Sequence, residues 1–220
     1  LGYMDNGGDE DMFHIDKDGL TLVGTAEHSI VPMHMGETFN SKDLPMRYVG
    51  FSTAFRREAG SYGKDTRGIL RVHQFDKVEM VSYVEEGEDD KEQEFLLSLE
   101  EKLFQALKIP YQVIKMCTGD LGFPAARKFD IEAWMPGQNK YREVTSVSTI
   151  GDFQSRRLNI KYQDGDKKKF ANILNGTAFA IGRTIIAILE NYQEKDGSVL
   201  VPEVLQKYMG GITKIERKAK

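Results

Sequence analysis

Residues 55–68 read FRREAGSYGKDTRG, a segment rich in glycine and basic residues that lies between two runs of β-prone residues. Arginine binds phosphate or carboxylate groups in bidentate fashion, and an aromatic ring can stack on a base. If residues 69–84 return as the second strand of a hairpin, residues of one parity share a face. That face carries Arg71, His73, Phe75, Lys77 and Glu79. It suits a bound nucleotide and equally suits the solvent side of an antiparallel sheet, so spacing leaves both interpretations open.

The glycine-rich backbone motifs that commonly hold phosphate do not occur in this sequence. A P-loop would require glycine at position 58, where Glu58 stands, and a hydroxyl residue at position 65, where Asp65 stands. Side chains must therefore hold any nucleotide. Strand periodicity places Arg56 and Glu58 on one face and Arg57 on the other.

Arg183 is the one charged residue in the apolar run from Ile173 to Leu189, which predicts a buried helix beginning near Asn175–Thr177. Burying a guanidinium group without a partner is costly, so Arg183 needs an anion beside it. That anion is a structural carboxylate or a bound ligand, and the sequence leaves both open.

A carboxylate and two hydroxyls end the predicted strand at 140–147, where the sequence reads YREVTS over residues 141–146. Hard oxygen donors such as Glu143 and Ser146 suit Mg²⁺ held together with substrate phosphates. The two have opposite strand parity, so joint ligation requires a bulge or the end of the strand between them.

Thr25, Ala26 and Glu27 predict the start of a helix, with Thr25 as its N-terminal cap.

The bulk composition predicts one globular domain over residues 1–220, and its net charge of -4 excludes a basic nucleic-acid coat. Cys117 is the single cysteine, which excludes a disulfide framework, favours a core role for its thiol, and indicates a reducing, cytoplasmic location. The four histidines lack metal-ligand spacing. No apolar run approaches the roughly 20 residues that cross a membrane.

Strand-like segments outnumber helical ones, which predicts an α+β fold with an antiparallel or mixed sheet flanked by helices. Apolar residues at helical spacing predict an amphipathic helix over Asp89–Lys108, ending before Pro110. Lys167–Lys169 is expected in a loop, and a short helix is expected at Val201–Met209. The predicted strands are residues 20–25, 46–56, 69–84, 111–117, 128–135 and 140–147.

Together these segments resemble the catalytic domain of the seryl-tRNA synthetases, a family of class II aminoacyl-tRNA synthetases. FRREAGSYGKDTRG with RVHQFDKVEM resembles motif 2, and NGTAFAIGRTIIAILENYQ resembles motif 3. The segments GTAEHSIVPMH, CTGDLGFPAARKFDIEAWMPGQNKYREVTSVS and DFQSRRLNIKY resemble those between. The match runs from about residue 24 to 209. It implies activation of L-serine by ATP, then transfer of the seryl group to tRNA(Ser).

The resemblance also implies roles for single residues, with ATP and Mg²⁺ as cofactors. Arg56 and Arg183 would be catalytic: Arg56 would bind the α-phosphate, and Arg183 would hold the outer phosphates. The implied ATP-binding residues are Arg56, Arg57, Glu58, Arg71, Phe75, Glu143, Val144, Thr145, Ser146 and Arg183. The implied serine-binding residues are Thr25, Ala26, Glu27, Arg56, Glu79, Asn175 and Thr177, and the implied metal ligands are Glu143 and Ser146. The loop at 59–68 would meet ATP first and the tRNA acceptor end afterwards.

Two features of the family are missing: an N-terminal helical arm that grips serine tRNA, and motif 1, which builds the homodimer interface. Only 24 residues precede Thr25. We therefore expect a catalytic fold truncated at the N-terminus, from a longer chain or a shortened homologue, with impaired dimerisation and tRNA charging. One alternative is a ligase that charges a carrier protein with a small amino acid, although its relatives use zinc bound by Cys and His. A non-catalytic binding module is the other.

Overall fold

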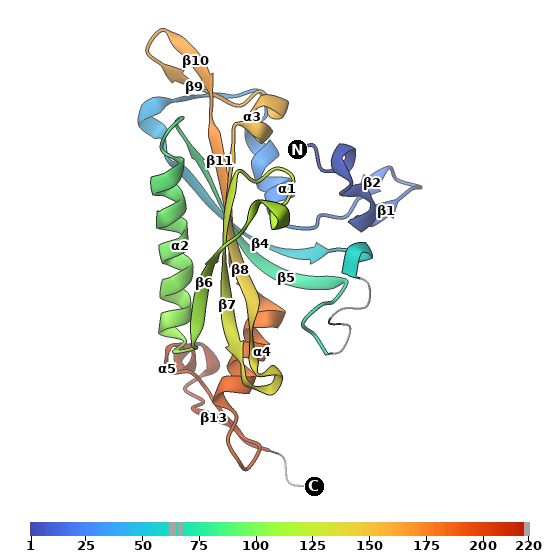
Figure 1. Cartoon of the computed structure of the whole chain (residues 1–220), viewed down its shortest axis with the longest axis vertical. Coiled ribbons are helices and arrows are strands. Elements are labelled where there is room, and N and C mark those ends of the chain that lie inside the picture. The colour runs from blue at the N-terminus through green and yellow to red at the C-terminus, as the bar shows by residue number, and fades with distance from the viewer. Residues whose placement is uncertain (62–64, 66–67, 218–220) are drawn as a thin grey trace.

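A six-stranded antiparallel sheet forms the centre of the molecule, with strand order β4-β5-β11-β8-β7-β6 (Figure 1). The computed structural model describes residues 1–61, 65 and 68–217. The strands of the central sheet are β4 (Met46–Phe55), β5 (Gln74–Val84), β6 (Tyr111–Lys115), β7 (Arg127–Met135), β8 (Lys140–Gly151) and β11 (Asn172–Ala180). The predicted hairpin is therefore β4 and β5, paired from Met46↔Tyr83 to Phe55↔Gln74.

Smaller sheets and helices surround this centre. The small sheets pair β1 (His14–Ile15) with β2 (Leu20–Thr21), β9 (Lys161–Asp164) with both β3 (Thr38–Asn40) and β10 (Lys167–Phe170), and β12 (Val199–Leu200) with β13 (Lys214–Ile215). The helices are α1 (Glu27–Ile30), α2 (Asp89–Ala106), α3 (Phe153–Leu158), α4 (Ile181–Tyr192) and α5 (Glu203–Gln206). Because β3 and β9 are parallel, strand pairing is mixed overall, and the predicted α+β class is confirmed.

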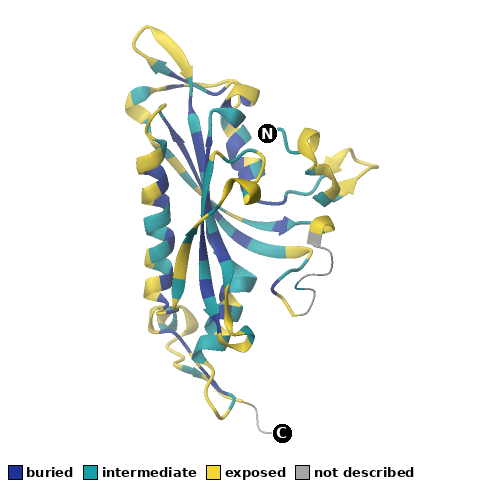
Figure 2. Cartoon of the chain, viewed as in Figure 1, coloured by how far each residue is buried: buried dark blue, intermediate teal, exposed yellow. Residues whose placement is uncertain are grey.

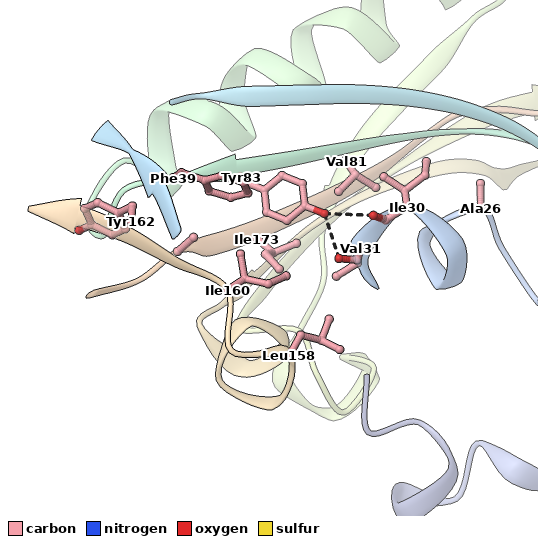
Figure 3. Close-up of a cluster of buried hydrophobic side chains, with 11 residues drawn as sticks. Ala26, Ile30, Val31, Phe39, Val81, Tyr83, Leu158, Ile160, Tyr162 and Ile173 are labelled. Carbon is pink, nitrogen blue, oxygen red and sulfur yellow. Dashed lines mark hydrogen bonds between the residues drawn. The ribbon is translucent and has the colours of Figure 1, made fainter. Parts of the chain in front are cut away.

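Helices cover the two faces of the central sheet unequally. On one face α2 and α4 bury a continuous apolar layer that includes Phe104, Ile131 and Ala187. On the other face α1 and α3 cover only one end of the sheet, around Tyr83 (Figure 3). The Tyr83 hydroxyl donates to the backbone oxygens of Ile30 at 3.2 Å and Val31 at 3.1 Å, which ties α1 to β5. The rest of this second face is left for polar side chains.

The alternation along β5 shows how the sequence divides that face. Val81 and Tyr83 lie buried beneath α1, whereas Lys77 and Glu79 have the same parity but lie farther toward the hairpin tip. Figure 2 shows the buried centre of the sheet and the more exposed outer strands. Lys77 and Glu79 therefore lie on a part of this sheet face that α1 does not cover, and such a part of the face is open to a ligand.

Helix α2 confirms the predicted amphipathic helix to within two residues at its C-terminal end. Its first turn carries Asp89 and Asp90, whose carboxylates favour the N-terminal end of the helix dipole. Leu96 and Phe104 are buried against the sheet. The helix ends at Ala106, and Lys108, with a left-handed backbone (φ 54°), turns the chain two residues before Pro110.

The predicted buried helix over 173–189 is wrong. Its first half is the central strand β11, between β5 and β8, and its second half is α4. A continuous apolar run suits a buried strand as well as a buried helix, and here two strand partners decide the outcome. Helix α4 is also amphipathic, since Ile185 and Leu189 are each 42% exposed. Arg183 therefore stands on a half-buried helix.

Several smaller expectations also differ. Lys167–Lys169 belongs to β10, an edge strand whose lysines are exposed, and Cys117 is exposed just before a 3₁₀ helix at Thr118–Asp120. Strand β5 begins at Gln74, so Arg71 and His73 precede it. The helix predicted at Val201–Met209 is divided into α5 and a 3₁₀ helix at Lys207–Met209. The strands predicted at 111–117, 128–135 and 140–147 are present as β6, β7 and β8, but β6 ends at Lys115 and β8 continues to Gly151. Residues 141–146 therefore lie inside β8 and do not end it. Of the strand predicted at 20–25, only Leu20–Thr21 is a strand, β2.

Candidate functional site

Two adjoining cavities open on the polar part of the sheet face. The first, of about 220 Å³, lies between the root of the β4–β5 hairpin, β8 and the start of α4. The second, of about 350 Å³, lies between the N-terminal segment, α1, β5 and β11. Arg56, Lys77, Ser146 and Thr177 line both cavities. The two cavities therefore form one continuous site, with these four residues at its junction.

Three arginines border the first cavity. Arg71 pairs with Glu58, and the Arg183 Nη1 donates to the backbone oxygen of Glu143 at 2.9 Å and to its carboxylate Oε2 at 3.2 Å. The guanidinium carbon of Arg56 lies 5.4 Å from the centre of the Phe75 ring. Of the two partners that the sequence left open for Arg183, the structure shows a carboxylate. Because Glu143 lines the same cavity, this ion pair belongs to the site itself.

A bulge in β8 brings the two predicted metal ligands onto one face. Thr145 pairs with Ile131 and Glu143 pairs with Glu132, so Val144 is an extra residue that the ladder skips. The extra residue reverses the parity, and Glu143 and Ser146 point to the same side of the sheet. Joint ligation of a metal required a bulge between Glu143 and Ser146, and that bulge is present. Both residues line the first cavity.

The electrostatics around Glu143 favour an ionised carboxylate. Burial by itself would raise its pKa, but Arg183 and then Lys128 outweigh burial, and the pKa of Glu143 is lowered. On the neighbouring strand, burial and the charge of Glu143 raise the pKa of Asp130 to about 6. Across the described residues, no three His, Cys, Asp or Glu side chains gather as a metal cage. Glu143 with Ser146 thus suits Mg²⁺ that draws its other ligands from phosphate and water.

The second cavity holds groups that complement a small zwitterion. Thr25 and Glu27 come from the start of α1, and the Thr25 hydroxyl accepts from the Glu27 backbone N–H at 3.3 Å. The predicted helix start is present, although Ala26 and not Thr25 is at its N-cap position, and both Thr25 and Glu27 line the cavity. Asn175 and Thr177 come from β11, and the Thr177 hydroxyl donates to Glu79 Oε2 at 3.4 Å.

This cavity contains an ion pair, Lys77–Glu79, and a neutral histidine, His28. Burial raises the pKa of Glu79, and its ion pair with Lys77 opposes that shift. Burial, followed by Arg56, lowers the pKa of His28 to about 4, so its imidazole is neutral at physiological pH. The carboxylate of Glu27 suits an ammonium group, Arg56 suits a carboxylate, and the Glu79–Thr177 pair suits a hydroxyl.

Two predicted site residues line neither cavity. The Arg57 Nε donates to the backbone oxygen of Met12 at 2.8 Å, and its guanidinium lies 4.9 Å from the centre of the Phe13 ring. Ala26 is buried in the apolar cluster beneath α1. The chain turns away from the strand after Phe55, and Glu58 has a left-handed backbone (φ 56°). Strand parity therefore does not apply there, although Arg56 and Glu58 still line one cavity.

The predicted loop at 59–68 lies partly outside the described residues, which omit 62–64 and 66–67. Within it, Asp65 pairs with Arg142 of β8.

The structure adds residues that sequence reasoning did not select for the site. Lys77 lines both cavities. Its position between Phe75 and Glu79 on the predicted hairpin face could have identified it as a site residue. Tyr3 and Lys128 line the second cavity, and no pattern in the sequence marks them.

A family model described as the tRNA synthetase class II core domain (G, H, P, S and T) matches residues 12–192. The chain belongs to this class II synthetase core family. The resemblance inferred from the motif 2 and motif 3 segments is confirmed. The synthetase core is 57% identical over 201 residues to a serine–tRNA ligase of Acidothermus cellulolyticus, covering 91% of this chain and 48% of the relative. It is 54% identical over 211 residues to one of Streptomyces coelicolor, covering 96% and 50%.

Solved structures agree on the fold. A seryl-tRNA synthetase from Pyrococcus horikoshii, complexed with ATP, has a TM-score of 0.92 and 49% identity, covering 96% of this chain and 47% of that one. A cytoplasmic serine–tRNA ligase from Naegleria fowleri, in complex with AMP, has a TM-score of 0.91 and 41% identity, covering 96% and 51%. The synthetase core thus spans about half the length of the curated relatives it matches. Its described helices include none long and apolar enough to cross a membrane.

Proposed function

We propose that this chain is the catalytic core of a serine–tRNA ligase, which activates L-serine with ATP and passes the seryl group to tRNA(Ser). The observation that carries the proposal is the pair of cavities that meet at Arg56, Lys77, Ser146 and Thr177. One cavity offers cations and an aromatic ring to a nucleotide, and the other offers partners for a small amino acid. The similarity to serine–tRNA ligases, including a structure complexed with ATP, supports the same pair of substrates.

In the proposed first step, a carboxylate oxygen of serine attacks the α-phosphorus of ATP, and pyrophosphate leaves with the electron pair of the broken P–O bond. Arg56 borders both cavities, so its guanidinium is placed to neutralise the serine carboxylate and the α-phosphate together. This chemistry relies on positioning and charge neutralisation, and it needs no protein nucleophile. The terminal ribose hydroxyl of tRNA then attacks the carbonyl carbon of seryl-adenylate, and AMP leaves.

The first cavity would hold the nucleotide. Phe75 would stack on adenine, Glu58 would contact the base, and Arg71 and Arg183 would hold the outer phosphates. The pairs Arg71–Glu58 and Arg183–Glu143 support this role, because each keeps a guanidinium group at the cavity wall. Mg²⁺ would be held by Glu143 and Ser146, where it would neutralise phosphate charge.

The second cavity would select serine. A site that hydrogen-bonds the serine hydroxyl leaves buried polar groups unpaired when alanine binds instead. Glu79, with its raised pKa, and Thr177 are the buried groups that would suffer that loss. Transfer to tRNA, and the cytoplasmic location expected from the sequence, stay predictions.

Serine-dependent exchange of labelled pyrophosphate into ATP tests this function directly. We expect exchange with serine and none above background with alanine, glycine or threonine. Arg56→Ala should abolish exchange, whereas Arg156→Ala should leave it unchanged, because Arg156 is an exposed residue of α3 that lines neither cavity.

The acceptor is tested separately by offering tRNA(Ser) and a carrier protein to the preformed adenylate. Transfer to tRNA supports the proposal, and transfer to the carrier protein alone supports the rival ligase. ATP and serine binding without exchange would identify a non-catalytic binding module and refute the proposed activity.

A further inference from the structure

The carboxylate of Glu27 is held asymmetrically. Its Oε1 accepts two hydrogen bonds, from the Tyr3 hydroxyl at 3.0 Å and from the Gln154 amide nitrogen at 2.6 Å. Glu27 is only 5% exposed and lines the second cavity. Among the described residues, no donor contacts Oε2. One oxygen is therefore saturated by the protein, while the other keeps its full accepting capacity.

The two donors come from segments far apart in the chain. Tyr3 belongs to the N-terminal segment that walls the second cavity, and its ring lies 4.8 Å from His28 and 5.3 Å from Phe123, between centroids. Burial and the charge of Glu27 raise the Tyr3 pKa, so the phenol remains a donor at physiological pH. Gln154 is fully buried on α3. Its amide must present nitrogen to Glu27, because its oxygen would be repelled by a carboxylate.

We propose that Tyr3 and Gln154 are positioning residues, which fix the Glu27 carboxylate so that its Oε2 accepts hydrogen bonds from the ammonium group of the amino-acid substrate. The inference rests on the proposed function. Two donors on one oxygen remove the rotational freedom of the carboxylate, so less ordering remains to be done when the substrate binds. The N-terminal segment thereby contributes to substrate affinity through Glu27.

A purely structural role for the Tyr3–Glu27 bond is the competing explanation. The positioning role and the structural role differ in one respect: only positioning makes the effect of losing this hydrogen bond depend on the ammonium group of the ligand. L-glycerate has the structure of L-serine with a hydroxyl in place of the ammonium group. Its carboxylate and terminal hydroxyl can still bind at Arg56 and Glu79, but it has no cation to bind the Glu27 carboxylate. Loss of positioning weakens serine selectively, whereas a collapsed site weakens both ligands.

The test measures dissociation constants for L-serine and L-glycerate by calorimetry, for the 220-residue chain and for Tyr3→Phe, which keeps the aromatic packing. We expect Tyr3→Phe to weaken serine about tenfold and L-glycerate less than twofold, since one hydrogen bond to a charged group is lost. The matched control is Tyr111→Phe, because the Tyr111 hydroxyl donates to Glu101 at 2.9 Å away from both cavities. The control should change neither constant.

Gln154→Met provides a second variant, since it removes the other donor at similar volume. Equal serine affinity in Tyr3→Phe and the parent chain overturns the inference, as does equal weakening of serine and L-glycerate. If the parent chain prefers another amino acid, the proposed serine specificity fails, and the same comparison with that amino acid and its hydroxy acid still decides the roles of Tyr3 and Gln154. Binding of no amino acid at all refutes both proposals.

Discussion

Replacing Glu100 by glutamine should stabilise the folded chain, and the gain should grow as the pH rises. Glu100 stands on α2 and is fully buried behind the sheet. Its Oε2 accepts from the Thr145 hydroxyl at 2.7 Å, and its Oε1 has no partner in the described part of the chain. No cation there pairs with it, in contrast to Glu92 on the same helix, which binds Arg47. Burial therefore raises the pKa of Glu100 to about 9.

The sign of the effect follows from proton linkage. Between the unfolded pKa of 4.5 and the folded pKa of about 9, the folded chain keeps a proton on Glu100 that the unfolded chain has released. Stability therefore falls as pH rises through this window, by about 1.4 kcal/mol per pH unit for one proton. Glutamine mimics the neutral acid and does not titrate. From pH 6 to pH 8, the variant should gain on the order of 3 kcal/mol relative to the parent chain.

Urea denaturation of both chains at pH 6, 7 and 8 measures this difference as a free energy of unfolding. The control is Glu94→Gln, which makes the same charge change on the exposed face of α2 and should give a constant offset. A free-energy difference between Glu100→Gln and the parent that stays constant from pH 6 to pH 8 would show that Glu100 is already ionised in the folded chain. That result would refute the argument from burial.

The other predictions concern the site and one surface contact. Arg183→Ala should abolish ATP-dependent serine activation while leaving the circular dichroism spectrum unchanged, and exchange near the parent level would exclude its role at the phosphates. Glu143→Gln should weaken Mg²⁺-dependent ATP binding far more than serine binding, whereas equal losses would indicate a collapsed site. Arg47→Ala should cost about 1 kcal/mol in urea at pH 7, because the buried carboxylate of Glu92 keeps only the Ser82 hydroxyl as a partner while solvent screens the half-exposed Arg47. Because Arg47 lowers the pKa of Glu92, that cost should shrink as pH falls below 4.5, and a pH-independent cost would contradict the pairing.

Local patterns in the sequence determined those elements whose hydrophobic periodicity fits only one type of secondary structure. Apolar spacing with acidic residues at its start predicts α2, and alternation places Phe75, Lys77 and Glu79 on one face of β5. The motif segments around Arg56 and Arg183 indicate the family, because those residue types in that order are specific even when their positions in space are unknown. These inferences hold because neighbouring residues in the chain are sufficient to make them.

Tertiary structure alone decided the features that depend on a partner strand or a distant segment. The apolar run at 173–189 became strand and helix because β5 and β8 pair with its first half. Val144 became a bulge through its register against β7, and only that bulge places Glu143 beside Ser146. The contact of Tyr3 with Glu27 joins segments with no shared pattern. Strand pairing and long-range hydrogen bonds depend on the free energy of the complete fold, so no local window of sequence determines them.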